Sequence, residues 1–125
     1  SIKNENTIIF HNSNDRSKLE LLKKRGTILI KQSIDKYKNL DLKKILKDLF
    51  KMEIRNLLVE GGDILTKNFL QSKLFNEFYM FRSSKNLSKN KKHVNFTSFS
   101  ILNTKYNKHK INSKLARDKL TIYKN

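Results

Sequence analysis

Residues 56–70 read NLLVEGGDILTKNFL, and this order predicts a strand, a glycine turn and a helix. Residues 57–59 form an uninterrupted apolar run, which is typical of a strand covered on both faces in a parallel or mixed sheet. Gly61 and Gly62 are two of only three glycines in the chain. Because glycine lacks Cβ, it permits positive φ and lets a ligand approach the backbone. The stretch therefore predicts the turn around which the rest of the fold is organised.

The helix after the turn is expected to begin at Asp63 as its N-cap. Its apolar face is predicted from Ile64, Leu65, Phe69 and Leu70. Unpaired N–H groups and the helix dipole make such an N-terminus an anion site. The alternative is a tight turn that binds nothing, and paired glycines alone do not decide between the two.

Composition narrows the classes of partner. The net charge is +17, but the lysines are dispersed, proline is absent, and lysine, asparagine and isoleucine share A/T-rich codons. We therefore interpret the charge as compositional and nucleic-acid binding as the less favoured reading, because arginine, the residue for bidentate phosphate contacts, is scarce. Cysteine is absent, and His11, His93 and His109 lack ligand spacing, so no metal site is predicted. With no signal peptide or membrane span in the sequence, a soluble cytoplasmic protein is expected.

The first half of the chain is predicted to contain a βαβ unit. Residues 7–10 and 27–30 are apolar runs that indicate parallel strands, and the helix between them ends before Gly26 as its C′ residue. Asp41 is predicted to cap the next helix, which would lead into the strand at 57–59 as a second βαβ unit. The apolar stripe of that helix is expected to be core: Leu42, Ile45, Leu46, Leu49 and Phe50.

The second half is predicted to finish the sheet with strands. Residues 78–81, 96–106 and 119–123 have strand-like composition, whereas residues 82–95 lack periodicity and are expected to form a mobile loop. Because no helix is predicted between the last two strands, they suggest an antiparallel finish to a mixed sheet.

The motif also resembles a known family. Three features carry the resemblance: the run LVEGG at 58–62, the apolar residues Leu65, Phe69, Leu70 and Leu74 after it, and the run NEFY at 76–79. Together they resemble the C-terminal reductase domain of bacterial riboflavin-biosynthesis deaminase-reductases. The resemblance implies an α/β, three-layer dihydrofolate-reductase-like domain with a mixed, mostly parallel sheet. It also implies NADPH-dependent reduction of 5-amino-6-(5-phosphoribosylamino)uracil to the ribitylamino product, with this pyrimidine ribose phosphate as substrate. A homodimer is expected, and a membrane partner is not.

Site residues follow from the same resemblance. Glu60 matches the family's substrate-contacting glutamate, although a hydrogen bond to neighbouring loop amides would explain it as well. Ser13 matches a cofactor-touching hydroxyl, and a helix cap is the alternative. The segment implied to wrap the cofactor's phosphates comprises Gly62, Asp63, Ile64, Leu65, Thr66, Lys67 and Asn68. A negative charge at Asp63 would compete with pyrophosphate, with Lys67 as a partial offset. No catalytic residue is assigned.

The chain also departs from the family pattern. Residues 82–88 read RSSKNLS and lack the proline and glycines that shape the family's loop. The family's strands before the region matching Thr7 are missing, as is its deaminase domain, so residues 1–125 are expected to be a single partial reductase domain that lacks its first strands. We therefore expect no substrate turnover by this chain alone. The alternatives are a basic nucleic-acid-binding module and a noncatalytic fragment that retains the fold.

Overall fold

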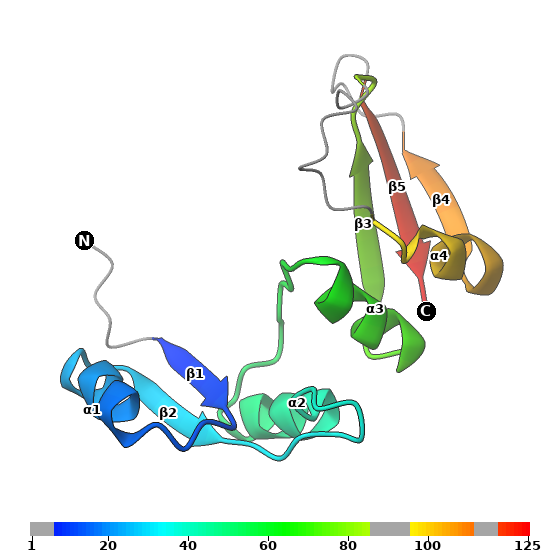
Figure 1. Cartoon of the computed structure of the whole chain (residues 1–125). Helices are drawn as coiled ribbons and strands as arrows, with labels where there is room; N and C mark the ends of the chain where they lie inside the picture. The colour runs from blue at the N-terminus through cyan, green and yellow to red at the C-terminus, as the bar shows by residue number, and fades with distance from the viewer. Residues whose placement is uncertain (1–6, 86–95, 112–117) are drawn as a thin grey trace. The chain divides into compact units, whose positions relative to one another are not determined.

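A computed structural model describes residues 7–85, 96–111 and 118–125. The chain divides into two compact units, Ser1–Leu58 and Val59–Asn125 (Figure 1). Each contains helices and its own small sheet, so the α/β class predicted from the sequence is confirmed. No helix in the described part of the chain is long and apolar enough to cross a membrane.

The first unit opens with the predicted βαβ arrangement. Strands β1 (Ile8–His11) and β2 (Ile28–Lys31) pair in parallel, with α1 (Arg16–Lys24) between them. The helix begins where the Asp15 carboxylate accepts a hydrogen bond from the Lys18 N–H. It ends before Gly26, whose φ of 78° is the left-handed conformation that glycine adopts without strain. These local signals confirm the parallel pair.

Helix α2 (Leu42–Lys51) also begins where the sequence predicts. The Asp41 carboxylate accepts from the Lys44 N–H and caps the helix. The apolar stripe, however, is only half-buried, and Phe50 is 61% exposed. A polar contact joins the helix to the end of β2, because Nε2 of the buried Gln32 donates to Asp48 at 2.5 Å. The expectation that this stripe forms a buried core is therefore wrong for this unit.

The strand predicted at residues 57–59 is absent. The backbone from residue 54 to residue 62 is neither helix nor strand, and Leu58 is 83% exposed. An apolar run becomes a strand only where another strand supplies partners for its N–H and C=O groups, and no described strand pairs with this one. The second βαβ unit consequently does not form.

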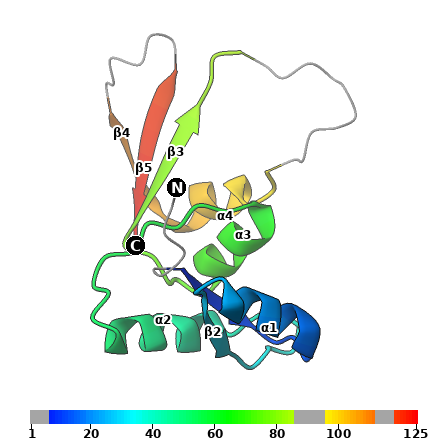
Figure 2. The same ribbon diagram turned by 90° about the vertical axis from the view of Figure 1, so that its left-hand side faces the viewer.

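The second unit places two helices against an antiparallel sheet. Helix α3 (Asp63–Gln71) leads to β3 (Glu77–Arg82), and α4 (Phe99–Lys105) leads to β4 (Asn107–Ile111) and β5 (Lys119–Lys124). The strand order is β3-β5-β4 with both pairs antiparallel, so the antiparallel finish is confirmed. Figure 2 shows α3 and α4 on the same side of this sheet. The described strands thus form two sheets, one parallel and one antiparallel, instead of one mixed, mostly parallel sheet.

The core of the second unit lies between its helices and its sheet. Leu70 of α3, Leu102 of α4 and Tyr123 of β5 are at most 2% exposed and pack together. Phe75 and Tyr106 contact this cluster, and their rings meet edge to face at 4.9 Å. The Tyr106 hydroxyl donates to the Leu70 carbonyl at 2.7 Å. This cluster holds the walls of the site described below.

One strand of the second unit was predicted wrongly. Residues 96–106 contain helix α4, and the strand begins only at Asn107. Phe99, Leu102 and Tyr106 also fit a helical spacing of three and four residues. In the structure Leu102 and Tyr106 belong to or contact the core cluster, and Phe99 is half-buried and lines the cleft described below. The loop predicted at 82–95 starts one residue later than expected, because Arg82 is the last residue of β3, and its residues 86–95 lie outside the described part of the chain.

Candidate functional site

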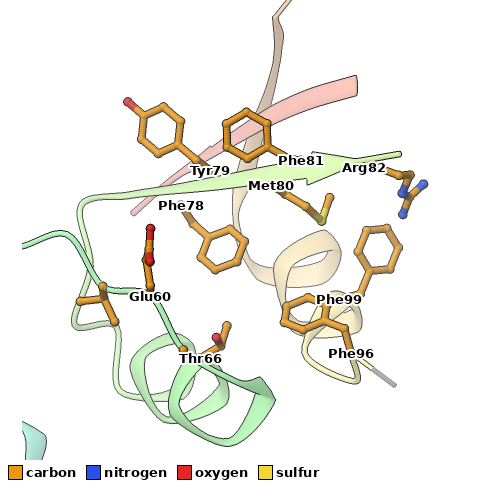
Figure 3. Close-up of a pocket in the computed structure, with 11 residues that line it drawn as sticks. Glu60, Thr66, Phe78, Tyr79, Met80, Phe81, Arg82, Phe96 and Phe99 are labelled. Atoms are coloured by element: carbon orange, nitrogen blue, oxygen red, sulfur yellow. The ribbon is translucent and has the colours of Figure 1, made fainter. Parts of the chain in front are cut away.

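A cleft of about 740 Å³ opens within the second unit (Figure 3). One wall is β3, a second is the glycine turn with the start of α3, and a third is the start of α4. The turn contributes Glu60, Gly61 and Thr66, and the start of α4 contributes Phe99. The cleft therefore joins the sequence motif to two segments that lie far from it in the chain.

Residues 78–82 of β3 all line the cleft, and their side chains point alternately to the two faces of the strand. Phe78 and Met80 project toward the two helices, whereas Tyr79 and Phe81 project from the other face of the strand (Figure 3) and are 49% and 66% exposed. At the end of β3, the Arg82 guanidinium carbon lies 4.8 Å from the centre of the Phe99 ring. The result is an apolar, aromatic wall that ends in a cation.

The two glycines of the turn have different structural roles. A Cβ on Gly61 would lie 2.7 Å from Cδ2 of Leu65, so this glycine allows the helix to pack against the turn. Gly62 is the N-cap residue of α3, and apart from Gly62 and its chain neighbours no group lies within 4 Å of the position that its Cβ would take. Its φ of −73° is open to any residue. Neither glycine needs positive φ, so close approach is the property that matters here.

Asp63 is not the N-cap of α3, contrary to the sequence-based expectation. It is the first helical residue, and its carboxylate instead accepts four hydrogen bonds from the start of α4. The Thr97 hydroxyl and N–H donate at 2.5 and 3.0 Å, and the Ser98 hydroxyl and N–H donate at 2.8 and 3.1 Å. These donors, the Thr97 hydroxyl first, lower the pKa of Asp63 below its ordinary value. Asp63 thus joins the beginnings of two helices.

The start of α3 has no side-chain cap of its own. Its first intrahelical bond of the usual kind runs from the Thr66 N–H to the Gly62 carbonyl at 3.1 Å. The N–H groups of the preceding helical residues therefore point out of the helix, as at any helix N-terminus. Together with the open space at Gly62, this leaves room and donors for an anionic group.

The structure separates the predicted site residues into groups. Glu60 and Thr66 line the cleft. Ile64 is 73% exposed, Lys67 is exposed, and Asn68 is half-buried, and these three do not line it. Leu65 packs on Gly61.

Ser13 belongs to the first unit, where its hydroxyl accepts from the Asp15 N–H at 3.1 Å. That contact makes Ser13 part of the turn that leads into α1, whose N-cap is Asp15, so Ser13 is not itself the helix cap. Its role with a cofactor stays a prediction.

Sequence reasoning missed most of the cleft's apolar wall. The alternation of β3 contained a usable signal, since Phe78, Met80 and Arg82 must share one face of any strand in this stretch. No comparable signal existed for the start of α4, because that stretch was read as a strand. The missed lining residues of β3 and of the start of α4 are Phe78, Tyr79, Met80, Phe81, Arg82, Phe96 and Phe99.

Comparison with known proteins supports the family suggested by the motif. Residues 2–113, which reach from the first unit into the second and include the whole glycine turn, match the family model described as RibD C-terminal domain. No curated protein matches this chain significantly. The chain belongs to the RibD C-terminal domain family, the reductase part of riboflavin-biosynthesis deaminase-reductases, and this membership indicates a reductase role in riboflavin biosynthesis.

Proposed function

We propose that this chain serves the NADPH-dependent reduction of 5-amino-6-(5-phosphoribosylamino)uracil to its ribitylamino product. The observation that supports the proposal is the cleft at the glycine turn, where Glu60 and an open helix N-terminus meet an aromatic wall. Proteins of this family generally use NADPH. The cofactor supplies the hydride, and the chain's own residues bind and orient the reactants.

The start of α3 is the proposed seat of the cofactor's phosphates. Outward-pointing N–H groups and the partial positive charge of the helix attract phosphate oxygens. The empty space beside Gly62 allows a pyrophosphate to reach the backbone. Lys67, exposed one turn later, adds a positive charge close to the same end of the helix.

Asp63 is compatible with this assignment. An aspartate beside a phosphate would ordinarily oppose binding. Its four donors from Thr97 and Ser98 supply partial positive charge to both carboxylate oxygens. This arrangement reduces the repulsion between Asp63 and an incoming anion, and the N-terminus of α3 retains its donors.

Glu60 and the aromatic wall are the proposed substrate contacts. A carboxylate accepts hydrogen bonds from the amino groups of a pyrimidine or the hydroxyls of a ribose chain. Phe78 offers an apolar face on which a flat heterocycle can stack. Holding the acceptor carbon beside the hydride donor is the main contribution expected of such a pocket, because orientation removes much of the entropic barrier.

Titration of the purified chain with NADPH, followed by the fluorescence of the reduced nicotinamide, tests the proposal. Gly62→Val should weaken binding by about tenfold or more, because a branched side chain would occupy the phosphate position and remove one or more charge-assisted hydrogen bonds. The Cβ of the new side chain would meet no neighbouring group of the chain within 4 Å. Ser72→Val, at the opposite end of α3, is the matched control and should bind as the wild type does.

Two outcomes would contradict this function. If the wild-type chain does not bind NADPH at all, the assignment of a cofactor to the second unit fails. If Gly62→Val binds NADPH with unchanged affinity, the phosphates do not lie at the glycine turn, whatever the activity of the protein.

A further inference from the structure

Arg82 occupies the end of the cleft that lies farthest from Glu60. In Figure 3, Glu60 and Arg82 lie at opposite ends of β3, with Phe78 and Met80 between them. Arg82 is four positions after Phe78, which corresponds to about 13 Å along an extended strand. The cleft therefore has an anionic end and a cationic end, joined by an apolar wall about as long as a heterocycle bearing an extended sugar phosphate.

The carboxylates of the second unit have other partners or lie at the other end of the cleft. Among the described residues, the ion pairs are Lys51 with Asp48 and Lys124 with Glu77, and Arg82 belongs to neither. Asp118 accepts from the Ser84 N–H at 3.1 Å, and Asp63 accepts from Thr97 and Ser98. Glu60 lies at the other end of the cleft.

Charge in the second unit is strongly positive. Val59–Asn125 contains fourteen lysines and arginines against four aspartates and glutamates, and residues 86–95 and 112–117 contain no acid at all. Across the sheet, Arg82 lies opposite another cation, Lys119. A guanidinium in such surroundings favours an anion from outside the chain.

The contact with Phe99 restrains this guanidinium, whose central carbon lies over the ring at 4.8 Å from its centre. A guanidinium held over an aromatic ring still has N–H groups that can donate at the edge of its plane. Those edge donors match two oxygens of a phosphate at once, which a lysine ammonium cannot do in the same fixed geometry. Arg82 is thus placed and shaped for a phosphate monoester.

We propose that Arg82, held by Phe99, binds the phosphate of a phosphorylated pentose whose other end reaches Glu60. This inference rests on the proposed function for the identity of the ligand, and it assigns a direction to the substrate in the cleft. Arg82 then selects phosphorylated over unphosphorylated sugars, and Phe99 is a positioning residue that acts through it.

Calorimetric titration of the full chain with ribose 5-phosphate tests the assignment, with ribose as the unphosphorylated comparison. Arg82→Gln should weaken binding of ribose 5-phosphate by about tenfold or more, the loss expected for charge-assisted hydrogen bonds. Arg82→Lys should recover only part of the lost affinity, because lysine restores the charge without the planar pair of donors. Lys119→Gln removes a neighbouring charge and should bind within about twofold of the wild type, as an exposed charge contributes little. Circular dichroism of each variant verifies that it folds.

The outcomes separate this inference from the cofactor assignment. Equal losses in Arg82→Gln and Lys119→Gln, or no binding of ribose 5-phosphate by the wild type, would overturn it. Titration with adenosine 2′,5′-bisphosphate is a second test. If Arg82→Gln loses affinity for that ligand alone, a cofactor phosphate lies at Arg82, which would also overturn the inference. NADPH titration of Arg82→Gln should give the wild-type affinity. If NADPH fails to bind any variant, the proposed function falls while the ribose 5-phosphate result still decides the role of Arg82.

Discussion

Leu102→Ala is expected to destabilise the second unit by about 2–5 kcal/mol. Leu102 is 0% exposed and packs against Leu70 and Tyr123, so it connects α4 to α3 and β5. The substitution removes three buried carbons, and at roughly 0.8 kcal/mol each the transfer cost alone is about 2.4 kcal/mol. The cavity left between three elements adds to this. Because whole domains are stable by only about 5–15 kcal/mol, the loss is a large fraction of the total.

Urea unfolding followed by near-ultraviolet circular dichroism measures this loss. The chain has no tryptophan, and two of its four tyrosines, Tyr106 and Tyr123, belong to or contact the core cluster. Ile64→Ala is the matched control, because it shortens an apolar side chain of the same unit that is 73% exposed. That variant should change stability by less than about 0.5 kcal/mol. Equal losses in the two variants would refute the conclusion that the cluster around Leu102 holds the walls of the cleft.

Three further predictions follow from single contacts. The pKa of folded Asp63 lies below its ordinary value of 3.8, so its hydrogen bonds stabilise the fold above that pH and are lost as the pH falls through the lower folded pKa. Asp63→Asn should therefore lower the thermal midpoint at pH 7 and flatten its decline below about pH 4; an unchanged decline would contradict this. Gly61→Val should lower the free energy of unfolding in urea by about 1–3 kcal/mol, because the new side chain clashes with Leu65, and Gly62→Val should lower it less. The reverse order would show that the turn packs differently. If the positive charge is compositional, duplex DNA should bind the chain weakly and without sequence preference, and fluorescence anisotropy should show its release at moderate salt. Submicromolar, sequence-selective binding at physiological salt would count against that interpretation.

Local chemistry made several features predictable. Asp15 and Asp41 each cap a helix within three residues of themselves, and Gly26 ends a helix by its own backbone freedom. The parallel pairing of β1 and β2 follows from a helix placed between two apolar runs. The LVEGG motif at 58–62 was sufficient to suggest the family that the comparison then confirmed.

The incorrect predictions share one cause. Residues 57–59 have the composition of a buried strand, but strand formation depends on backbone partners that composition does not supply. Residues 99–105 have strand-like composition, but Asp63 accepts four hydrogen bonds at Thr97 and Ser98, where the helix begins. In the first case the strand is not formed because a distant partner is missing. In the second, contacts with a distant residue favour a helix over the strand that the composition suggests.

The sequence by itself determined the α/β class, the capped helices, the parallel pair and the family, because each depends on neighbouring residues or on a contiguous motif. Only the tertiary structure decided which motif residues face a cleft. It brought Glu60 and Thr66 to one wall, and it committed Asp63 to residues 34 and 35 positions away. It also set Arg82 against Phe99. These pairings arise from packing α3 and α4 on one face of a sheet, and the pattern of a single strand or helix does not contain that information.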